Sequence, residues 1–269
     1  MKFRDWALLL AGAGAAALVY GALYESKRLV VRRITISLPN WPERLDGYRI
    51  ALMADFHLRD VYSLELAQHA ILKTLEEDPD MVVLAGDFVG YWKPQSEAML
   101  EDVLTPMLLL NGDVVAVPGN HDYWLGTPDR LLPVMNRCNI KLLRNETWVH
   151  HGINWVGIDS ACYGHAKASR AIEGVGSGPR IVLWHEPDPV EELPFDADLQ
   201  LSGHSHGGQW RFPGWTPMHT RLGERYVDGY YPREGSTPIF VTTGVGTTGP
   251  PARMMCPPEV AILTLRSKA

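Results

Sequence analysis

Apolar segments that each end in a polar motif constrain the fold of this chain more than any other feature of its sequence. Three of them, residues 48–54, 81–85 and 114–117, have the length and composition of buried strands. The motifs that follow them are Asp55-Phe56-His57, Gly86-Asp87 and Gly119-Asn120-His121-Asp122. Helical apolar spacing predicts a helix from Ser63 to the stop at Asp78, and a second helix over residues 96–110. Alternating strands and helices predict an α/β fold, in which sites lie at the carboxyl ends of the strands.

Strand-like segments also lie outside this first series. Residues 29–38 precede it, residues 146–159 have the pattern of a hairpin, and residues 128–136 that of another helix. A strand over residues 181–184 ends in His185, and a strand ending at Leu201 runs into Gly203-His204-Ser205-His206. We expect residues 239–242 and 260–265 to complete a second sheet. The whole pattern predicts two mainly β layers flanked by helices.

These motifs together supply metal-ligating side chains. His204 and His206 follow a strand two residues apart, so they share a face; alone, this pair is equally typical of exposed loop histidines. Seven side chains form a set of mixed nitrogen and oxygen donors, namely Asp55, His57, Asp87, Asn120, His185, His204 and His206. Because seven ligands are too many for one ion, we expect two divalent ions about 3.5–4 Å apart, bridged by a carboxylate. Manganese, iron, zinc and nickel all accept these donors.

Composition narrows the class of protein. With 269 residues, of which 46% are hydrophobic, the chain can bury one large core, and no Ser/Gly-rich linker divides it. The formal net charge of -6 argues against a nucleic-acid-binding protein, which normally carries a basic excess. Cys138, Cys162 and Cys256 are too few and too scattered for a disulfide framework or a thiolate zinc site. We expect them to be packing residues in a reducing compartment.

The N-terminus differs from the rest of the chain. Residues 6–24 contain no charged side chain and have Lys and Arg on both flanks. This pattern predicts a transmembrane anchor over residues 1–27, followed by a catalytic domain over residues 28–269. A cleavable signal peptide and a buried core helix are the alternatives, although the run is long for a signal peptide. More Lys and Arg follow the run than precede it, which favours a cytoplasmic catalytic domain.

In order and spacing, the motifs resemble those of the calcineurin-like metallophosphoesterase superfamily. The resemblance runs from about Tyr48 to the end of the chain. It implies a four-layer α/β/β/α sandwich whose dinuclear site hydrolyses phosphoesters by metal-activated hydroxide. One metal would be held by Asp55, His57, Asp87 and His206, and the other by Asp87, Asn120, His185 and His204. His121 would face the substrate as a general acid or charge stabiliser, and Asp122 would orient its ring.

Residues 206–209 and 244–259 further resemble a membrane-associated bacterial phosphodiesterase branch that includes a UDP-2,3-diacylglucosamine pyrophosphatase type of lipid A synthesis. That resemblance implies a lipid-linked nucleotide as substrate and a place at the bacterial inner membrane. In residues 242–249 backbone N–H groups could cradle a phosphate, so Gly244, Gly246 and Arg253 are the expected substrate contacts; a plain connector is the alternative.

Two alternatives to this function remain open from the sequence. One is a broad phosphodiesterase acting on soluble esters, and the other is a non-catalytic metal-binding scaffold. The scaffold is less favoured because it has no need for His121 beside a complete ligand set. The aromatic segment over residues 210–231 could contact lipid or bases, or it could be an ordinary packed excursion.

Overall fold

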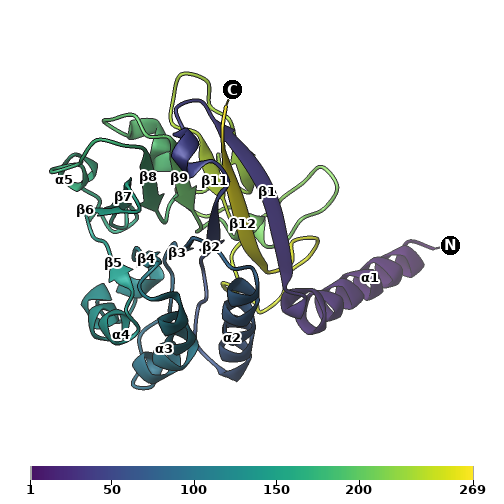
Figure 1. Cartoon of the computed structure of the whole chain (residues 1–269). Coiled ribbons are helices and arrows are strands. Elements are labelled where there is room, and N and C mark those ends of the chain that lie inside the picture. The colour runs from purple at the N-terminus through teal and green to yellow at the C-terminus, as the bar shows by residue number, and fades with distance from the viewer. Residues whose placement is uncertain (1, 269) are drawn as a thin grey trace.

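Two sheets pack face to face in the computed structural model, which describes residues 2–268 (Figure 1). The first sheet contains β1 (Val30–Leu38), β2 (Tyr48–Met53), β3 (Met81–Leu84), β4 (Val114–Ala116), β5 (Lys141–Leu142) and β12 (Glu259–Ser267). The second contains β6 (Glu146–His150), β7 (Ile153–Ile158), β8 (Arg180–Trp184), β9 (Leu199–Ser202), β10 (Gly229–Tyr231) and β11 (Ile239–Val241). The strand orders are β1-β12-β2-β3-β4-β5 and β10-β11-β9-β8-β7-β6. The helices are α1 (Phe3–Leu23), α2 (Val61–Glu76), α3 (Ser96–Leu104), α4 (Leu131–Arg137) and α5 (Ala168–Ala171).

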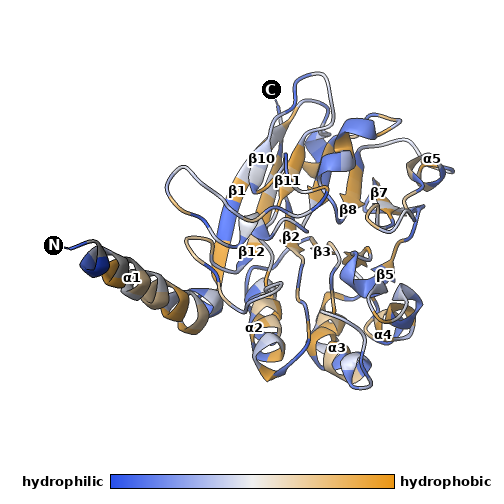
Figure 2. Ribbon diagram, turned by 180° about the vertical axis from the view of Figure 1, so that it is seen from behind, coloured by the Kyte–Doolittle hydropathy of each residue, from blue (hydrophilic) through white to orange (hydrophobic). Residues whose placement is uncertain are grey.

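Strand β2 shows why the central strands are mainly apolar. Its side chains alternate between two cores: Ile50 and Leu52 face the second sheet, whereas Ala51 and Met53 face the helices. Both faces are therefore buried, as is typical of strands in parallel sheets that are covered on both sides. Figure 2 shows the same hydrophobic character in β3 and β11. The core between the sheets includes Trp155, which is fully buried.

Helices α2, α3 and α4 lie side by side on the outer face of the first sheet (Figure 1). The start of α2 is fixed by a reciprocal cap, in which Asp60 Oδ1 accepts the Ser63 N–H at 2.9 Å and Ser63 Oγ accepts the Asp60 N–H at 3.0 Å. The helix therefore begins at Val61, slightly earlier than predicted from Ser63. It packs Ala67 and Ile71 against the sheet.

The outer layer over the second sheet is thin. It consists of the short helix α5 and loop residues that pack on Val156, Ile158 and Val182. The presence of two packed sheets and of a helical layer over the first is thus as predicted, while short helical turns and loops make most of the fourth layer. The chain keeps β2, β3 and β4 parallel in one sheet and β8, β9 and β11 parallel in the other. Their carboxyl ends carry the polar motifs.

The prediction that residues 260–265 complete the second sheet is wrong. Strand β12 lies in the first sheet, where it pairs in parallel with β1 and antiparallel with β2. Its successive residues Ile262 and Leu263 point to opposite faces and enter different cores. An apolar pattern of this kind suits the centre of either sheet, because it specifies burial and not the neighbouring strand.

Helix α1 projects away from the domain (Figure 1). None of the helices within residues 2–268 is long and apolar enough to cross a membrane, so the prediction of a transmembrane anchor is not supported. The helix contacts the domain at its C-terminal end, where the Gly21 carbonyl accepts the Arg253 N–H at 3.1 Å. The contact requires glycine, since a Cβ on Gly21 would lie 2.6 Å from the Arg253 carbonyl oxygen.

Candidate metal centre

The predicted ligands converge from both sheets. Asp55 and His57 follow β2, Asp87 follows β3, Asn120 follows β4, His185 follows β8, and His204 and His206 follow β9. Asn120 is half-buried, and the other six are at most 5% exposed. Parallel strands in two packed sheets bring these loops together because their carboxyl ends meet at one edge of the sandwich.

Asp87 lies at the middle of the cluster. Its Oδ2 is 3.4 Å from His57 Nε2 and 3.3 Å from His185 Nε2. Asp55 Oδ1 lies 3.4 Å from His206 Nε2. The possible ligand atoms form two main groups, Asp55-His57-His206 and Asp87-His185-His204, and Asp87 also groups with His57. A single carboxylate is therefore positioned to be shared by two cations.

The donor atoms of this cluster suit divalent metal ions. Asn120 Oδ1 and His185 Nε2 are buried and, within residues 2–268, have no hydrogen-bond partner, which ordinarily costs about 1–3 kcal/mol per group. The opposite nitrogen of His185, Nδ1, donates to the Ala85 carbonyl at 2.6 Å. His204 Nε2 donates to the Arg221 carbonyl at 2.7 Å. Such bonds fix the tautomer and ring orientation of metal-ligating histidines.

Burial and local charge set the protonation of these groups. Burial lowers the pKa values of His57, His204 and His206, so these rings are neutral as ligands must be. For Asp55, burial acts to raise the pKa, but the neighbouring histidines outweigh it and the pKa is lowered. His185 shows the opposite balance: burial acts to lower its pKa, yet Asp87 and Asp55 raise it overall. The two carboxylates therefore favour a positive charge at this position, which a bound metal ion would also supply.

The ligand loops have strained backbones. Five ligand residues have positive φ angles: Asp55 (58°), His57 (47°), Asp87 (56°), His204 (71°) and His206 (51°). Residues other than glycine rarely adopt this region, and each instance costs on the order of 1–3 kcal/mol. Such strain clusters at functional sites. The surrounding glycines permit close packing, since a Cβ on Gly203 would lie 2.6 Å from Asp55 Oδ2.

Similarity to known proteins agrees with this geometry. The family profile of the calcineurin-like phosphoesterases matches residues 48–208. The uncharacterized metallophosphoesterase YkuE of Bacillus subtilis is 31% identical over 96% of this chain and 94% of its own length. The chain belongs to the calcineurin-like phosphoesterase family. The phosphodiesterase YaeI of Escherichia coli is 33% identical over 81% of this chain and 82% of its own length. The crystal structure of TT1561 from Thermus thermophilus shares the fold, with a TM-score of 0.50 at 13% identity over 74% of this chain and 90% of that chain.

Because it belongs to this family, the protein is a metal-dependent phosphoester hydrolase. The cluster of His and Asp side chains could hold its metal ions. The metal could be any of several divalent ions, because the donors do not select one.

The role expected of Asp122 in the phosphoesterase is wrong. His121 Nδ1 donates to the Gly90 carbonyl at 2.7 Å, so this carbonyl orients the ring. The Asp122 carboxylate instead accepts four backbone N–H groups, from Asp87, Phe88, Val89 and Gly119, at 2.8–3.3 Å. Asp122 therefore holds the Asp87 loop against the Gly119 loop. It is a positioning residue for the metal ligands.

The phosphate-binding role expected of Arg253, Gly244 and Gly246 does not fit the structure. Arg253 is fully buried, and its guanidinium donates to backbone carbonyls of the surrounding loop. The Gly244 N–H donates to Thr242 Oγ1, and the Gly246 N–H donates to the Asp55 carbonyl at 2.6 Å. These donors are already paired, so they do not form a phosphate cradle. The loop instead supports Asp55 from behind.

A cavity of about 230 Å³ opens over the phosphoesterase ligands. Four residues of its lining were not predicted as site residues: Cys162, Thr220, Arg221 and Thr248. Thr220 Oγ1 is buried and has no hydrogen-bond partner within residues 2–268, while Arg221 is exposed at the rim. Burial and Glu186 raise the pKa of Cys162 to about 12, so its thiol is neutral.

Thr220 and Arg221 lie in the aromatic segment over residues 210–231. This segment contains no metal-ligand motif and no helical or strand periodicity, so its sequence did not mark these two as site residues. The same segment packs Tyr226 into a small core with Val190 and Ile239. It therefore both packs on the domain and reaches the site.

Proposed function

We propose that this phosphoesterase hydrolyses a phosphodiester or pyrophosphate bond at two divalent ions. Asp55, His57, Asp87 and His206 would hold one ion, and Asp87, Asn120, His185 and His204 the other. The observation that carries the proposal is the central position of Asp87 Oδ2, within 3.4 Å of histidine nitrogens from both ligand groups. Two bound divalent ions supply an activated water and neutralise phosphate charge.

The charge of the ligand set supports an anionic substrate. Among the seven ligands only Asp55 and Asp87 are carboxylates, so two divalent ions leave the site with net positive charge. Asn120 is a neutral ligand and preserves that charge. Arg221 at the rim of the cavity adds a cation that could bind nonbridging phosphate oxygens.

We assign proton transfer to His121. Its Nδ1 is held by the Gly90 carbonyl, which leaves Nε2 as the nitrogen available to the cavity that the ring lines. As an imidazolium, with a proton on each nitrogen, His121 protonates the leaving oxygen through Nε2 or stabilises charge on the phosphoryl group. The ring packs edge-on against His57 and Trp124, which restricts its rotation.

The favoured substrate is an amphiphilic, lipid-linked nucleotide, with UDP-2,3-diacylglucosamine as the first compound to test. We propose that α1 attaches the catalytic domain, residues 28–269, to the cytoplasmic face of the bacterial inner membrane. Exposed apolar residues on α1, among them Leu8, Leu9 and Leu18, support this attachment, and Lys27 and Arg28 follow at the surface. The runner-up is a broad phosphodiesterase on soluble esters, supported by similarity to a relative named as a phosphodiesterase.

Product analysis with metal-loaded protein tests these proposals. UDP-2,3-diacylglucosamine in detergent should give UMP and the lipid phosphate, detected by mass spectrometry. The Asp87→Asn variant is the matched control for contaminating hydrolases. Turnover of bis(p-nitrophenyl) phosphate without turnover of the lipid nucleotide would favour the runner-up. If protein that holds two ions hydrolyses neither compound, the proposed function is wrong.

A further inference from the structure

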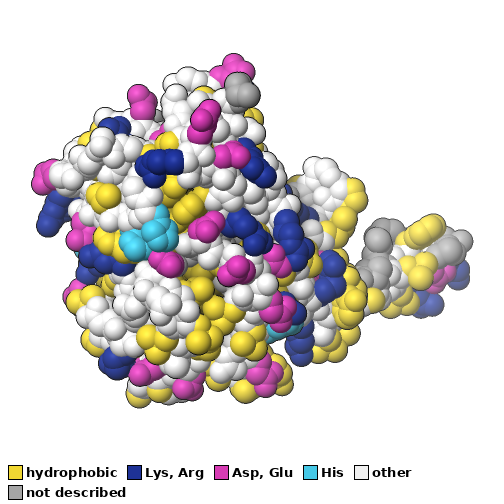
Figure 3. All heavy atoms as spheres, viewed as in Figure 1, with side chains coloured by type: hydrophobic (Ala, Val, Ile, Leu, Met, Phe, Trp, Pro, Cys, Tyr) yellow, Lys and Arg dark blue, Asp and Glu magenta, His cyan; other side chains and the backbone are white. Residues whose placement is uncertain are grey.

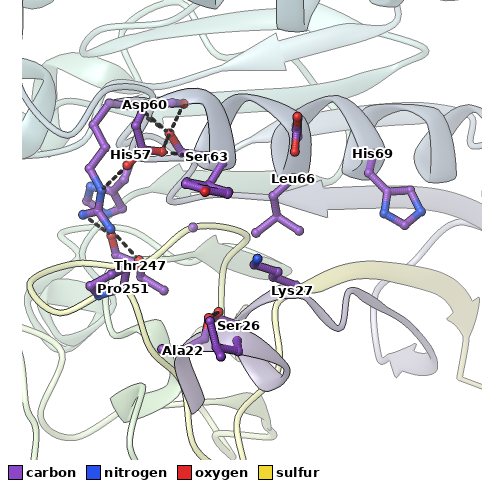
Figure 4. A pocket seen from close by; sticks show the side chains of 15 residues that line it. Ala22, Ser26, Lys27, His57, Asp60, Ser63, Leu66, His69, Thr247 and Pro251 are labelled. Carbon is purple, nitrogen blue, oxygen red and sulfur yellow. Dashed lines mark hydrogen bonds and ion pairs between the residues drawn. The ribbon is translucent and has the colours of Figure 1, made fainter. Parts of the chain in front are cut away.

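We propose that a groove between α1 and α2 binds the alkyl chain of the substrate beside the metal centre. This inference rests on the proposed function, because it assumes that the phosphoester lies at the metal ligands. The groove has a volume of about 610 Å³, within the roughly 300–1,000 Å³ of ligand pockets. Its walls are the end of α1 with the following turn, the first half of α2, and the loop over residues 246–251 (Figure 4).

The groove adjoins the candidate metal centre. His57, one of the predicted metal ligands, lines its inner end. From there the groove runs along α2 past Leu66 toward His69, with Ala22 on the opposite wall (Figure 4). In this proposal a ligand with its phosphate at the metal centre extends past His57 into the groove.

Several of the polar groups along the groove are paired within the protein. The Arg59 guanidinium donates to the Thr247 carbonyl at 3.0 Å and to Thr247 Oγ1 at 2.8 Å. Asp60 and Ser63 cap each other at the start of α2. Ser26 Oγ donates to the Ala22 carbonyl at 2.9 Å.

The apolar part of the wall comes from Ala22, Leu23, Leu66 and Pro251, and α2 also contributes Tyr62, Glu65 and His69. The apolar part fits an alkyl chain. Lys27 also lines the groove, with its Nζ 5.0 Å from the centre of the Tyr62 ring.

Helix α1 gives such a ligand a route into the groove. The space-filling view shows hydrophobic side chains along the projecting helix (Figure 3). Leu18 and Val19 are more than half exposed, and Leu23, at the edge of the groove, is 67% exposed. The apolar surface of α1 thus leads into the apolar wall of the groove.

A series of p-nitrophenyl alkyl phosphodiesters from methyl to decyl, used below their critical micelle concentrations, tests the proposal. Each buried methylene raises affinity by up to about fourfold, so burial of about four methylenes should raise kcat/KM on the order of 10²-fold. The Ala22→Trp substitution fills the groove and should reduce the decyl-to-methyl ratio of kcat/KM at least tenfold. Leu66→Gln makes the wall polar at similar size and should lower the same ratio. Leu72→Trp is the matched control, because Leu72 is exposed on α2 and does not line the groove.

Calorimetric binding of decylphosphonate, with methylphosphonate as reference, separates the groove from the chemistry. The groove is supported if decylphosphonate binds more tightly than methylphosphonate and if this difference is lost in Ala22→Trp and kept in Leu72→Trp. That result would stand even if no diester were hydrolysed, and failed hydrolysis would overturn the proposed function alone. Equal binding of the two phosphonates, or equal loss in both tryptophan variants, would overturn the groove while diester hydrolysis still stands.

Discussion

Replacing Arg253 with methionine should destabilise the whole domain rather than weaken substrate binding. The side chain is fully buried, and its guanidinium donates to the carbonyl oxygens of Thr243, Gly244, Gly246 and Cys256 at about 2.9–3.2 Å. Methionine fills a similar length but donates no hydrogen bond. Four buried carbonyls would therefore lose their common donor.

The expected loss of stability follows from those four groups. A buried polar group left without a partner costs about 1–3 kcal/mol. Local relaxation and water entry recover part of that sum, so we expect the free energy of unfolding to fall by about 3–5 kcal/mol. In a domain of this size that change lowers Tm by roughly 6–20 °C. Metal affinity should fall as well, because the same loop donates the Gly246 N–H to the Asp55 carbonyl.

Urea unfolding followed by circular dichroism, with and without added metal, measures the first effect, and mass spectrometry of bound metal measures the second. Arg137→Met is the matched control. Arg137 is exposed and pairs with Glu101 at 2.7 Å, and a surface ion pair of this kind contributes little to stability. If Arg253→Met unfolds within about 0.5 kcal/mol of the wild type and only raises KM, Arg253 contacts substrate and its structural role is refuted.

Three further variants test the metal centre. Asp87→Asn should lose at least one ion and nearly all turnover, because it weakens the shared ligand; two tightly held ions by mass spectrometry would contradict the bridging position. His121→Ala should keep both ions and slow hydrolysis of alkyl diesters by ~10²–10⁴-fold, with a smaller loss for p-nitrophenyl esters, whose leaving group needs less protonation. Equal losses across leaving groups would instead make His121 an electrostatic clamp. Gly203→Ala should lower metal affinity, since its Cβ would lie 2.6 Å from Asp55 Oδ2. Gly176→Ala is the control and should keep the affinity, because the atom nearest to a Cβ there is 3.6 Å away. Equal affinities of the two variants in calorimetric titration with Mn²⁺ would contradict this reasoning.

The sequence by itself determined the positions of most strands, although not of β5 and β10, and the chemistry at the ends of the central strands. In β2 the apolar run that starts at Ile50 indicated a buried strand, and the structure places Ile50 and Ala51 in different cores. The motifs after these strands were sufficient to predict the ligand cluster, because the carboxyl ends of parallel strands meet at one edge. The periodicity of apolar residues and the chemistry of side chains are local properties, which can be read directly from a sequence.

Only the tertiary structure decided which groups are already paired. Arg253 and Asp122 have the chemistry of a phosphate contact and of a histidine partner, yet both are used to hold loops together. The groove between α1 and α2 likewise joins residues such as Ala22 and Leu66, which no short motif connects. The same limit explains the misplaced β12, whose apolar pattern fits either sheet. A hydrogen bond or a strand pairing depends on a partner distant in the chain, and its geometry exists only once both segments have packed.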